Sequence, residues 1–143
     1  YDHVRPLLER YGLASFARKK PAQLSGGMRQ RCALIRTLAT DPSTLLLDEP
    51  FSALDYQTRL AVSADIWHII RQEGKTALLV THDIAEAVSM SDRVVVLSRR
   101  PAVVKAVFDM GALKPLPPME RRDTPQFHTF FNAIWKELDI HGG

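Results

Sequence analysis

The segment Thr44-Leu45-Leu46-Leu47-Asp48-Glu49-Pro50 is the most informative part of this sequence for the fold class. Its apolar run is too short for a helix and ends in two acids and a proline, which is typical of a buried parallel strand leading into a loop. A second such run spans 76–80, and residues with helical spacing fill the interval between the two. Because strands and helices continue to alternate, we predict an α/β fold with a largely parallel sheet flanked by helices.

Hydrophobic periodicity predicts the remaining elements. Apolar residues three and four apart indicate helices at about 4–11, 28–39, 56–72, 84–88 and 127–138. Short apolar runs indicate strands at 44–47, 76–80, 94–97 and 103–108. Gly12 and Gly74 should end the first and third helices, and Thr124-Pro125 should begin the last. The prolines at 115, 117 and 118 indicate a linker before that last helix.

Length and composition limit the classes of function. The 143 residues, 45% of them hydrophobic, are enough for one domain with a buried core. The 19 Lys and Arg nearly balance 16 Asp and Glu, and they are dispersed, which argues against nucleic-acid binding. We therefore expect basic pairs such as Arg121-Arg122 to be solvated surface. A single cysteine, Cys32, excludes an internal disulfide and a thiolate zinc site, and no apolar stretch approaches the ~20 residues of a membrane helix.

The glycine positions exclude a phosphate-binding P-loop within these 143 residues. Such a loop needs two glycines five apart, with a lysine directly after the second. No pair among the seven glycines has that spacing. Gly74-Lys75-Thr76 imitates the end of a P-loop, but Ile69 stands where its first glycine should be. We interpret this segment as a turn that leads into a strand.

Two adjacent acids at the end of the first strand, Asp48 and Glu49, are the first candidates for chemistry. Ligands of open α/β sheets bind at the carboxyl ends of strands. Mg²⁺ takes oxygen ligands and keeps waters, so one acid could hold the metal while its neighbour orients or deprotonates an attacking water. Pro50 should restrict Glu49 to an extended backbone. The alternative is that both acids are only solvated in a loop.

Two further segments could contact a phosphate group. Leu24-Ser25-Gly26-Gly27 precedes a helix, where glycines let backbone N–H groups approach an anion and the serine adds a hydroxyl donor. A plain loop is the alternative for this segment. His82 follows the second strand, so it should emerge at the same sheet edge as the two acids. Its imidazole could donate to a phosphate oxygen or hold the water-activating carboxylate.

Taken in order, four motifs resemble those of the ATP-binding subunits of ABC transporters. They are Leu24-Ser25-Gly26-Gly27-Met28-Arg29-Gln30-Arg31 as the signature, 44–49 as the Walker B strand, Ser52-Ala53-Leu54-Asp55 as the D-loop and Thr81-His82-Asp83 as the switch histidine. The resemblance runs from Tyr1 to about Phe108 and implies part of a P-loop NTPase fold of the ABC type. It divides the chain into the end of a helical subdomain (1–23), the C-terminal half of the catalytic core (24–110) and a linker with a C-terminal helix (111–143).

The resemblance implies an ATP hydrolase that drives transport, with ATP and Mg²⁺ as cofactors. Asp48 would lie near Mg²⁺, Glu49 would act as the general base, and His82 would sense the γ-phosphate. The signature turn would contact the nucleotide held by another subunit, through the residues Ser25, Gly26 and Gly27. Asp55 of the D-loop would lie at the interface between the two subunits and near that nucleotide.

The resemblance also implies partners and a location. The partners would be a second ATP-binding subunit, transmembrane permease subunits and, indirectly, an extracytoplasmic solute-binding protein, with no nucleic acid. The subunit would sit on the cytoplasmic face of the cell membrane. The residues at 28–31, 49–55 and 124–127 are similar to those of the ABC transporter branch that imports nitrate, sulfonates and taurine.

The Walker A loop of such a subunit would lie upstream of Tyr1. We therefore expect the chain to be the C-terminal half of an importer ATPase and to be inactive by itself. Two alternatives share these motifs. One is a soluble, non-transport ABC ATPase of DNA repair or translation, and the other is a naturally truncated regulatory half-domain without activity of its own.

Overall fold

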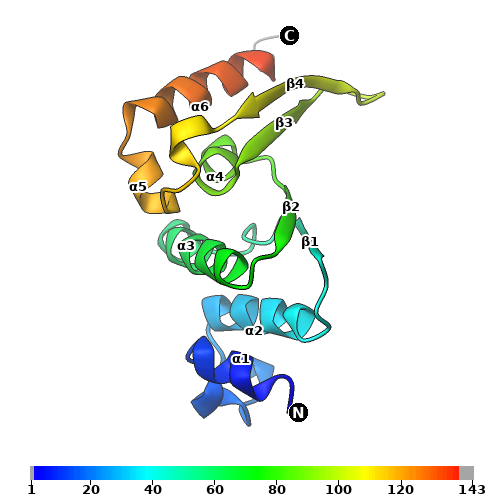
Figure 1. Cartoon of the computed structure of the whole chain (residues 1–143), viewed down its shortest axis with the longest axis vertical. Helices are drawn as coiled ribbons and strands as arrows, with labels where there is room; N and C mark the ends of the chain where they lie inside the picture. The colour runs from blue at the N-terminus through cyan, green and yellow to red at the C-terminus, as the bar shows by residue number, and fades with distance from the viewer. Residues whose placement is uncertain (1, 139–143) are drawn as a thin grey trace. The chain divides into compact units, whose positions relative to one another are not determined.

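The computed structural model describes residues 2–138 (Figure 1). Tyr1 and residues 139–143, the end of the expected C-terminal segment, lie outside the described residues. The chain forms two compact units, Tyr1–Val80 and Thr81–Gly143, each with one two-stranded sheet. None of the helices within residues 2–138 has both the length and the apolar character needed to cross a bilayer.

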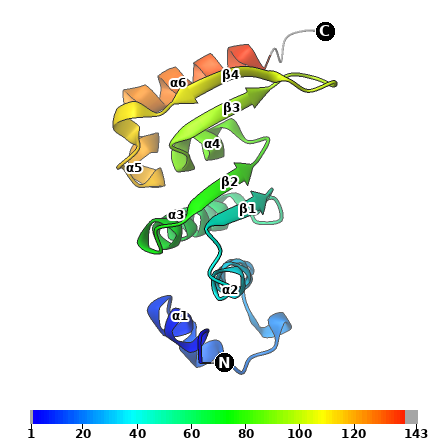
Figure 2. The ribbon, with the colours of Figure 1, turned by 45° about the vertical axis from the view of Figure 1, so that its right-hand side comes forward.

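A parallel pair of strands forms the sheet of the first unit. The elements of this unit are, in order, α1 (Arg5–Arg10), α2 (Gly26–Leu38), β1 (Thr44–Asp48), α3 (Tyr56–Gln72) and β2 (Thr76–Val80), with 3₁₀ turns at Ala14–Phe16 and Pro21–Gln23. β1 and β2 pair in parallel from Thr44↔Thr76 to Asp48↔Val80, side by side in Figure 2. α3 is the crossover connection that parallel pairing requires. The α/β class and these predicted elements are confirmed.

The buried side chains of the first unit come mainly from α2, α3 and β1. They include Leu34, Ile35 and Leu38 of α2, Val62, Ile66 and Ile69 of α3, and Leu45 of β1. On each helix they are mostly three or four residues apart, so the periodicity that predicted the helix also identified its buried face. Gly74 follows α3 with a φ of +63°, a backbone conformation that favours glycine, and it lets the chain turn into β2.

An antiparallel hairpin and three helices form the second unit. Its elements are α4 (Ile84–Met90), β3 (Arg93–Leu97), β4 (Val104–Asp109), α5 (Pro118–Arg122) and α6 (Pro125–Glu137), with a 3₁₀ turn at Gly111–Leu113. β3 and β4 pair from Arg93↔Asp109, with a register shift after Val96. The positions of both strands were predicted, but their pairing is not parallel. Residues 98–103 are too few for a crossover, so they can only join the strands as a hairpin.

The proline-rich segment before the last helix is not only a linker. α5 begins at Pro118, where proline is favourable because the first helical residue needs no N–H donor and proline already has a helical φ. Thr124 then caps α6 by accepting a hydrogen bond from the backbone N–H of Phe127 at 3.2 Å. The predicted start of the last helix is therefore confirmed.

One hydrophobic cluster holds the second unit together. It comprises Ile84, Val88, Val94, Val96, Met110, Leu113, Phe127 and Ile134, and the rings of Phe130 and Phe131 pack against it. α6 lies beside the hairpin in Figure 2 and contacts both α4 and β4. The side of α6 that carries Phe127, Phe130, Phe131 and Ile134 is thus a packing face.

Candidate functional site

Asp48 and Glu49 lie at the carboxyl end of β1, as predicted. The N–H of Glu49 donates to the carbonyl oxygen of Val80 at 2.8 Å, so parallel pairing continues one residue past β1. Glu49 then turns sharply, with a φ of +46°. The expectation that Pro50 holds Glu49 extended is therefore wrong. A left-handed backbone at a residue with a side chain costs about 1–3 kcal/mol and persists only where neighbouring contacts impose it.

The turn after Glu49 supplies those contacts. The carbonyl oxygen of Glu49 accepts hydrogen bonds from the N–H of Ser52 at 3.4 Å and from its hydroxyl at 3.1 Å. The ring of Phe51 has no exposed surface and anchors the turn in the core. Asp48 is exposed and Glu49 is half-buried. The turn thus fixes the backbone that carries two accessible neighbouring carboxylates.

These two carboxylates suit a hard cation. Among residues 2–138, no group of three or more His, Cys, Asp or Glu side chains is arranged to hold a metal. Mg²⁺ is commonly bound by one or two carboxylates, with waters and substrate phosphates completing its coordination. The donor set at the end of β1 therefore fits Mg²⁺ held together with a phosphate ligand, and it does not fit a metal that needs a complete protein cage.

Ser25 is the N-cap of α2. Its Oγ accepts a hydrogen bond from the N–H of Met28 at 3.1 Å, and the residue is exposed. A hydroxyl that accepts from the helix keeps its own hydrogen to donate. Ser25 can therefore donate to an anion in front of α2, where the helix dipole also favours negative charge.

Close packing of α2 explains the two glycines after Ser25. A Cβ on Gly27 would lie 2.8 Å from Cγ2 of Val62 in α3, and a Cβ on Gly26 would lie 2.9 Å from Cδ2 of Leu54. Both distances are too short for real atoms to occupy unless something moves. The glycines thus let the start of α2 pack against α3 and the D-loop segment. This packing role comes in addition to the anion contact that the sequence predicted for the two glycines.

Asp55 begins α3 as its N-cap. Its Oδ1 accepts from the N–H of Thr58 at 3.0 Å, and its Oδ2 accepts from the Thr58 hydroxyl at 2.7 Å. These hydrogen bonds favour the ionised carboxylate and lower the pKa of Asp55 below its usual range. The structure therefore shows Asp55 as a helix cap, next in sequence to the Leu54 side chain that faces Gly26.

His82 is exposed and belongs to the second unit. It lies between Thr81, whose hydroxyl oxygen accepts from the N–H of Asp83 at 3.0 Å, and Asp83, the N-cap of α4. It follows Val80, the partner of Asp48 in the parallel ladder, by two residues. Its convergence with the two acids on one ligand stays a prediction.

The chain is similar to known ABC transporter proteins over most of its length. Residues 2–52 match the family model described as ABC transporter. The uncharacterized ABC transporter ATP-binding protein YtlC of Bacillus subtilis is 48% identical over 93% of this chain and 52% of its own length. The aliphatic sulfonates import ATP-binding protein SsuB 2 of Pseudomonas syringae pv. tomato is 43% identical over 86% of the chain and 53% of its own length. The nitrate import ATP-binding protein NrtC of Synechococcus elongatus is 39% identical over 92% of the chain and 20% of its own length.

The resemblance to ABC transporter ATP-binding proteins is confirmed. A solved ABC transporter of the metal-chelate type, in an inward-facing conformation, aligns with a TM-score of 0.65 at 23% identity. That alignment covers 77% of this chain and 43% of the other, and it shows the fold alone. The chain spans about half the length of YtlC and SsuB 2.

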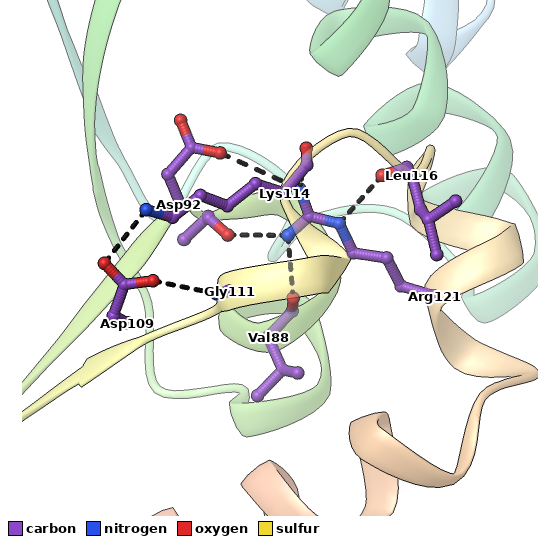
Figure 3. Close-up of polar contacts among 8 residues, drawn as sticks. Val88, Asp92, Asp109, Gly111, Lys114, Leu116 and Arg121 are labelled. Carbon is purple, nitrogen blue, oxygen red and sulfur yellow. Dashed lines mark hydrogen bonds and ion pairs between the residues drawn. The ribbon is translucent and has the colours of Figure 1, made fainter.

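Arg121 lies outside the ABC motifs, and the structure shows that it is buried. The prediction that Arg121-Arg122 is solvated surface is wrong for Arg121, because its side chain has no exposed surface. Its guanidinium donates to backbone carbonyl oxygens around the end of α4 (Figure 3). No local sequence signal separates a buried arginine from a solvated one, since only the packing of α5 against α4 buries it.

Proposed function

We propose that the full-length protein is the ATP-hydrolysing subunit of an ABC importer, and that this chain supplies the Walker B carboxylates, D-loop, signature turn and switch histidine. The main support for the proposal is the end of β1, where exposed Asp48 precedes Glu49. Hydrogen bonds with Val80 and Ser52 hold the left-handed backbone of Glu49. Strained backbone that neighbouring hydrogen bonds impose is characteristic of functional sites. The names of the ABC relatives support the same activity.

The two acids would have different tasks. The exposed carboxylate of Asp48 would hold Mg²⁺, which when bound neutralises the charge that develops on phosphate oxygens. Glu49 would accept the proton of the attacking water, a role that needs a carboxylate fixed in direction. The hydrogen-bonded turn that begins at Glu49 fixes the backbone from which this carboxylate projects. Asp48 and Glu49 thus form the hydrolytic pair of the proposal.

His82 and Ser25 would recognise the γ-phosphate from two subunits. His82, exposed ahead of the capped helix α4, would hydrogen-bond the phosphate of its own subunit's nucleotide. Ser25, with the N–H groups of Gly26 and Gly27, would contact the nucleotide of a second ATP-binding subunit. Asp55 would lie at that subunit interface, where its cap keeps the D-loop joined to α3.

The importer would contain further subunits. We propose transmembrane permease subunits on the membrane side, an extracytoplasmic solute-binding protein that acts through them, and a position for this subunit on the cytoplasmic face of the membrane. We propose that the solute is small, such as a sulfonate, taurine or nitrate, and the names of SsuB 2 and NrtC support a sulfonate or nitrate. The division into 1–23, 24–110 and 111–143 belongs to the same proposal.

The substitution Glu49→Gln in the full-length protein tests the hydrolytic role. Glutamine keeps the size of the side chain but cannot accept a proton, so turnover should fall by about 10²–10⁴-fold while Mg-ATP still binds. Phosphate release and calorimetric ATP titration measure the two quantities. Glu120→Gln makes the same chemical change at an exposed glutamate outside the proposed site, so it is the matched control and should leave both quantities unchanged.

The size of the effect decides the assignment. A loss of less than about tenfold, which corresponds to ~1.4 kcal/mol, would show that Glu49 is not the principal base. Loss of ATP binding together with turnover would show instead that the substitution disturbs the nucleotide site as a whole, and would contradict a purely chemical role.

A further inference from the structure

Among the described residues, Arg121 is the largest side chain without exposed surface. Its Nε donates to the carbonyl oxygen of Leu116 at 2.8 Å, and its Nη2 donates to that of Lys114 at 2.9 Å. Its Nη1 donates to the carbonyl oxygens of Val88 at 3.2 Å and Ser91 at 2.6 Å (Figure 3). The Asp92 carboxylate also forms an ion pair with Nη2 of Arg121 at 3.9 Å. A buried cation is costly unless its donors are paired, so these four carbonyls and this carboxylate explain how the charge is tolerated.

Two of the four carbonyls belong to the C-terminal end of α4. Val88 lies in its last turn and Ser91 is its C-cap. Carbonyl groups at this end lack partners within the helix and carry the negative end of its dipole, which a cation stabilises. α4 has only seven residues, and so short a helix has little stability of its own. Contacts with the rest of the second unit, including those at its two ends, therefore decide where it lies.

The other end of α4 carries the switch histidine. Asp83 caps this end by accepting a hydrogen bond from the N–H of Glu86 at 3.1 Å, and His82 directly precedes Asp83. Seven residues of helix span roughly 10 Å. Ile84 and Val88 pack into the hydrophobic cluster of the second unit, so α4 is held along its length as well as at its ends.

We propose that Arg121 is a positioning residue for ATP hydrolysis, which sets the place of His82 through α4. This inference rests on the proposed role of His82 at the γ-phosphate. Arg121 ties the end of α4 to the segment containing Lys114 and Leu116, and this segment leads into α5. The C-terminal part of the chain thereby fixes the helix that carries His82. Arg121 itself is not catalytic, because its side chain is fully buried and its contacts are with carbonyl groups of the second unit and with the carboxylate of Asp92.

The substitution Arg121→Lys in the full-length protein tests the inference. Lysine keeps the charge but replaces the planar fork of donors by a single ammonium group, which cannot serve carbonyls on both sides. A misplacement of about 1 Å can cost up to ~100-fold, so we expect kcat to fall by roughly 10–100-fold with the KM for Mg-ATP nearly unchanged. Arg122→Lys is the matched control in the same helix, because Arg122 contacts the Ser89 hydroxyl at 3.5 Å rather than the carbonyls of α4.

A double-mutant cycle with His82→Ala separates positioning from a general loss of structure. If Arg121 acts through His82, Arg121→Lys should lower kcat in the parent protein and should add little in the His82→Ala background. An equal loss in both backgrounds would overturn the inference and leave the role of His82 intact. Normal turnover of His82→Ala alone would overturn both the role of His82 and the inference.

The thermal midpoint of each variant shows whether it is folded. If Arg121→Lys does not give folded protein, Arg121→Gln replaces it in the same cycle, because an amide can still donate to a carbonyl without burying a charge. The same two results for kcat then support or overturn the positioning role.

Discussion

Gly27→Ala is the substitution whose effect on stability can be worked out most directly from the structure. The new Cβ would lie 2.8 Å from Cγ2 of Val62, which is only 3% exposed. Val62 is β-branched and lies in α3, so it has one strongly preferred rotamer and cannot rotate away. Overpacking of this kind costs about 1–3 kcal/mol, and the better helix propensity of alanine offsets up to ~1 kcal/mol. We expect a net loss of about 1 kcal/mol.

The thermal midpoint of the full-length protein measures this loss. About 1 kcal/mol lowers the midpoint by roughly 2–4 °C in a chain of 150–250 residues. Gly26→Ala is the matched comparison, because its Cβ would meet Cδ2 of Leu54, the far end of a flexible side chain that can move aside. Its midpoint should therefore fall less than that of Gly27→Ala.

A second substitution removes the obstacle and tests the reasoning itself. Val62→Ala eliminates the Cγ2 atom, so in that background Gly27→Ala should be neutral or stabilising. If Gly27→Ala lowers the midpoint equally in both backgrounds, the contact with Val62 is not the reason that glycine is needed at this position.

Three further predictions concern nucleotide binding and pH. The 143-residue chain alone should bind Mg-ATP weakly and hydrolyse none, because it contains no P-loop lysine or backbone cradle; micromolar affinity in calorimetry together with phosphate release would contradict this. Full-length subunits with a disabled P-loop, mixed with subunits carrying Ser25→Arg, should partly regain ATPase activity if the signature turn acts on the other subunit's nucleotide; equal inactivity of proven mixed dimers counts against that. Glu73 accepts hydrogen bonds from Tyr11 and Arg10, and these lower its pKa although its partial burial acts in the opposite direction. The stability that these hydrogen bonds add is complete above the unfolded pKa of about 4.3. It is lost as the pH falls through the lower pKa of the folded state. Glu73→Gln should therefore flatten the acid side of the midpoint-against-pH curve, and an unchanged slope would refute the contribution.

Much of the fold could be predicted because its signals are local. The bounds of α3 and β2 agree with their predicted ranges, since an apolar stripe or a short apolar run is bounded by residues such as Gly74. The antiparallel pairing of β3 and β4 was accessible in principle from the six residues between them. α5 was missed because its prolines were interpreted as breaking structure rather than as beginning a helix.

The sequence predicted which residues belong to the candidate site, but it did not predict their backbone conformations or their contacts. Asp48, Glu49, Ser25 and Asp55 all lie at strand or helix ends, where the order of motifs placed them. The left-handed backbone of Glu49 was not foreseen, because pairing with β2 and the buried ring of Phe51 impose it against the local preference of a residue before proline.

Local sequence patterns predicted the strands, every α-helix except α5, the residues at their ends and the ABC motifs, because periodicity, capping and spacing act over a few neighbouring residues. Tertiary contacts were needed to show that Gly27 must lack a Cβ beneath Val62 and that Arg121 is buried on the carbonyls of α4. Both depend on contacts between residues thirty or more positions apart, and local sequence patterns do not report such contacts.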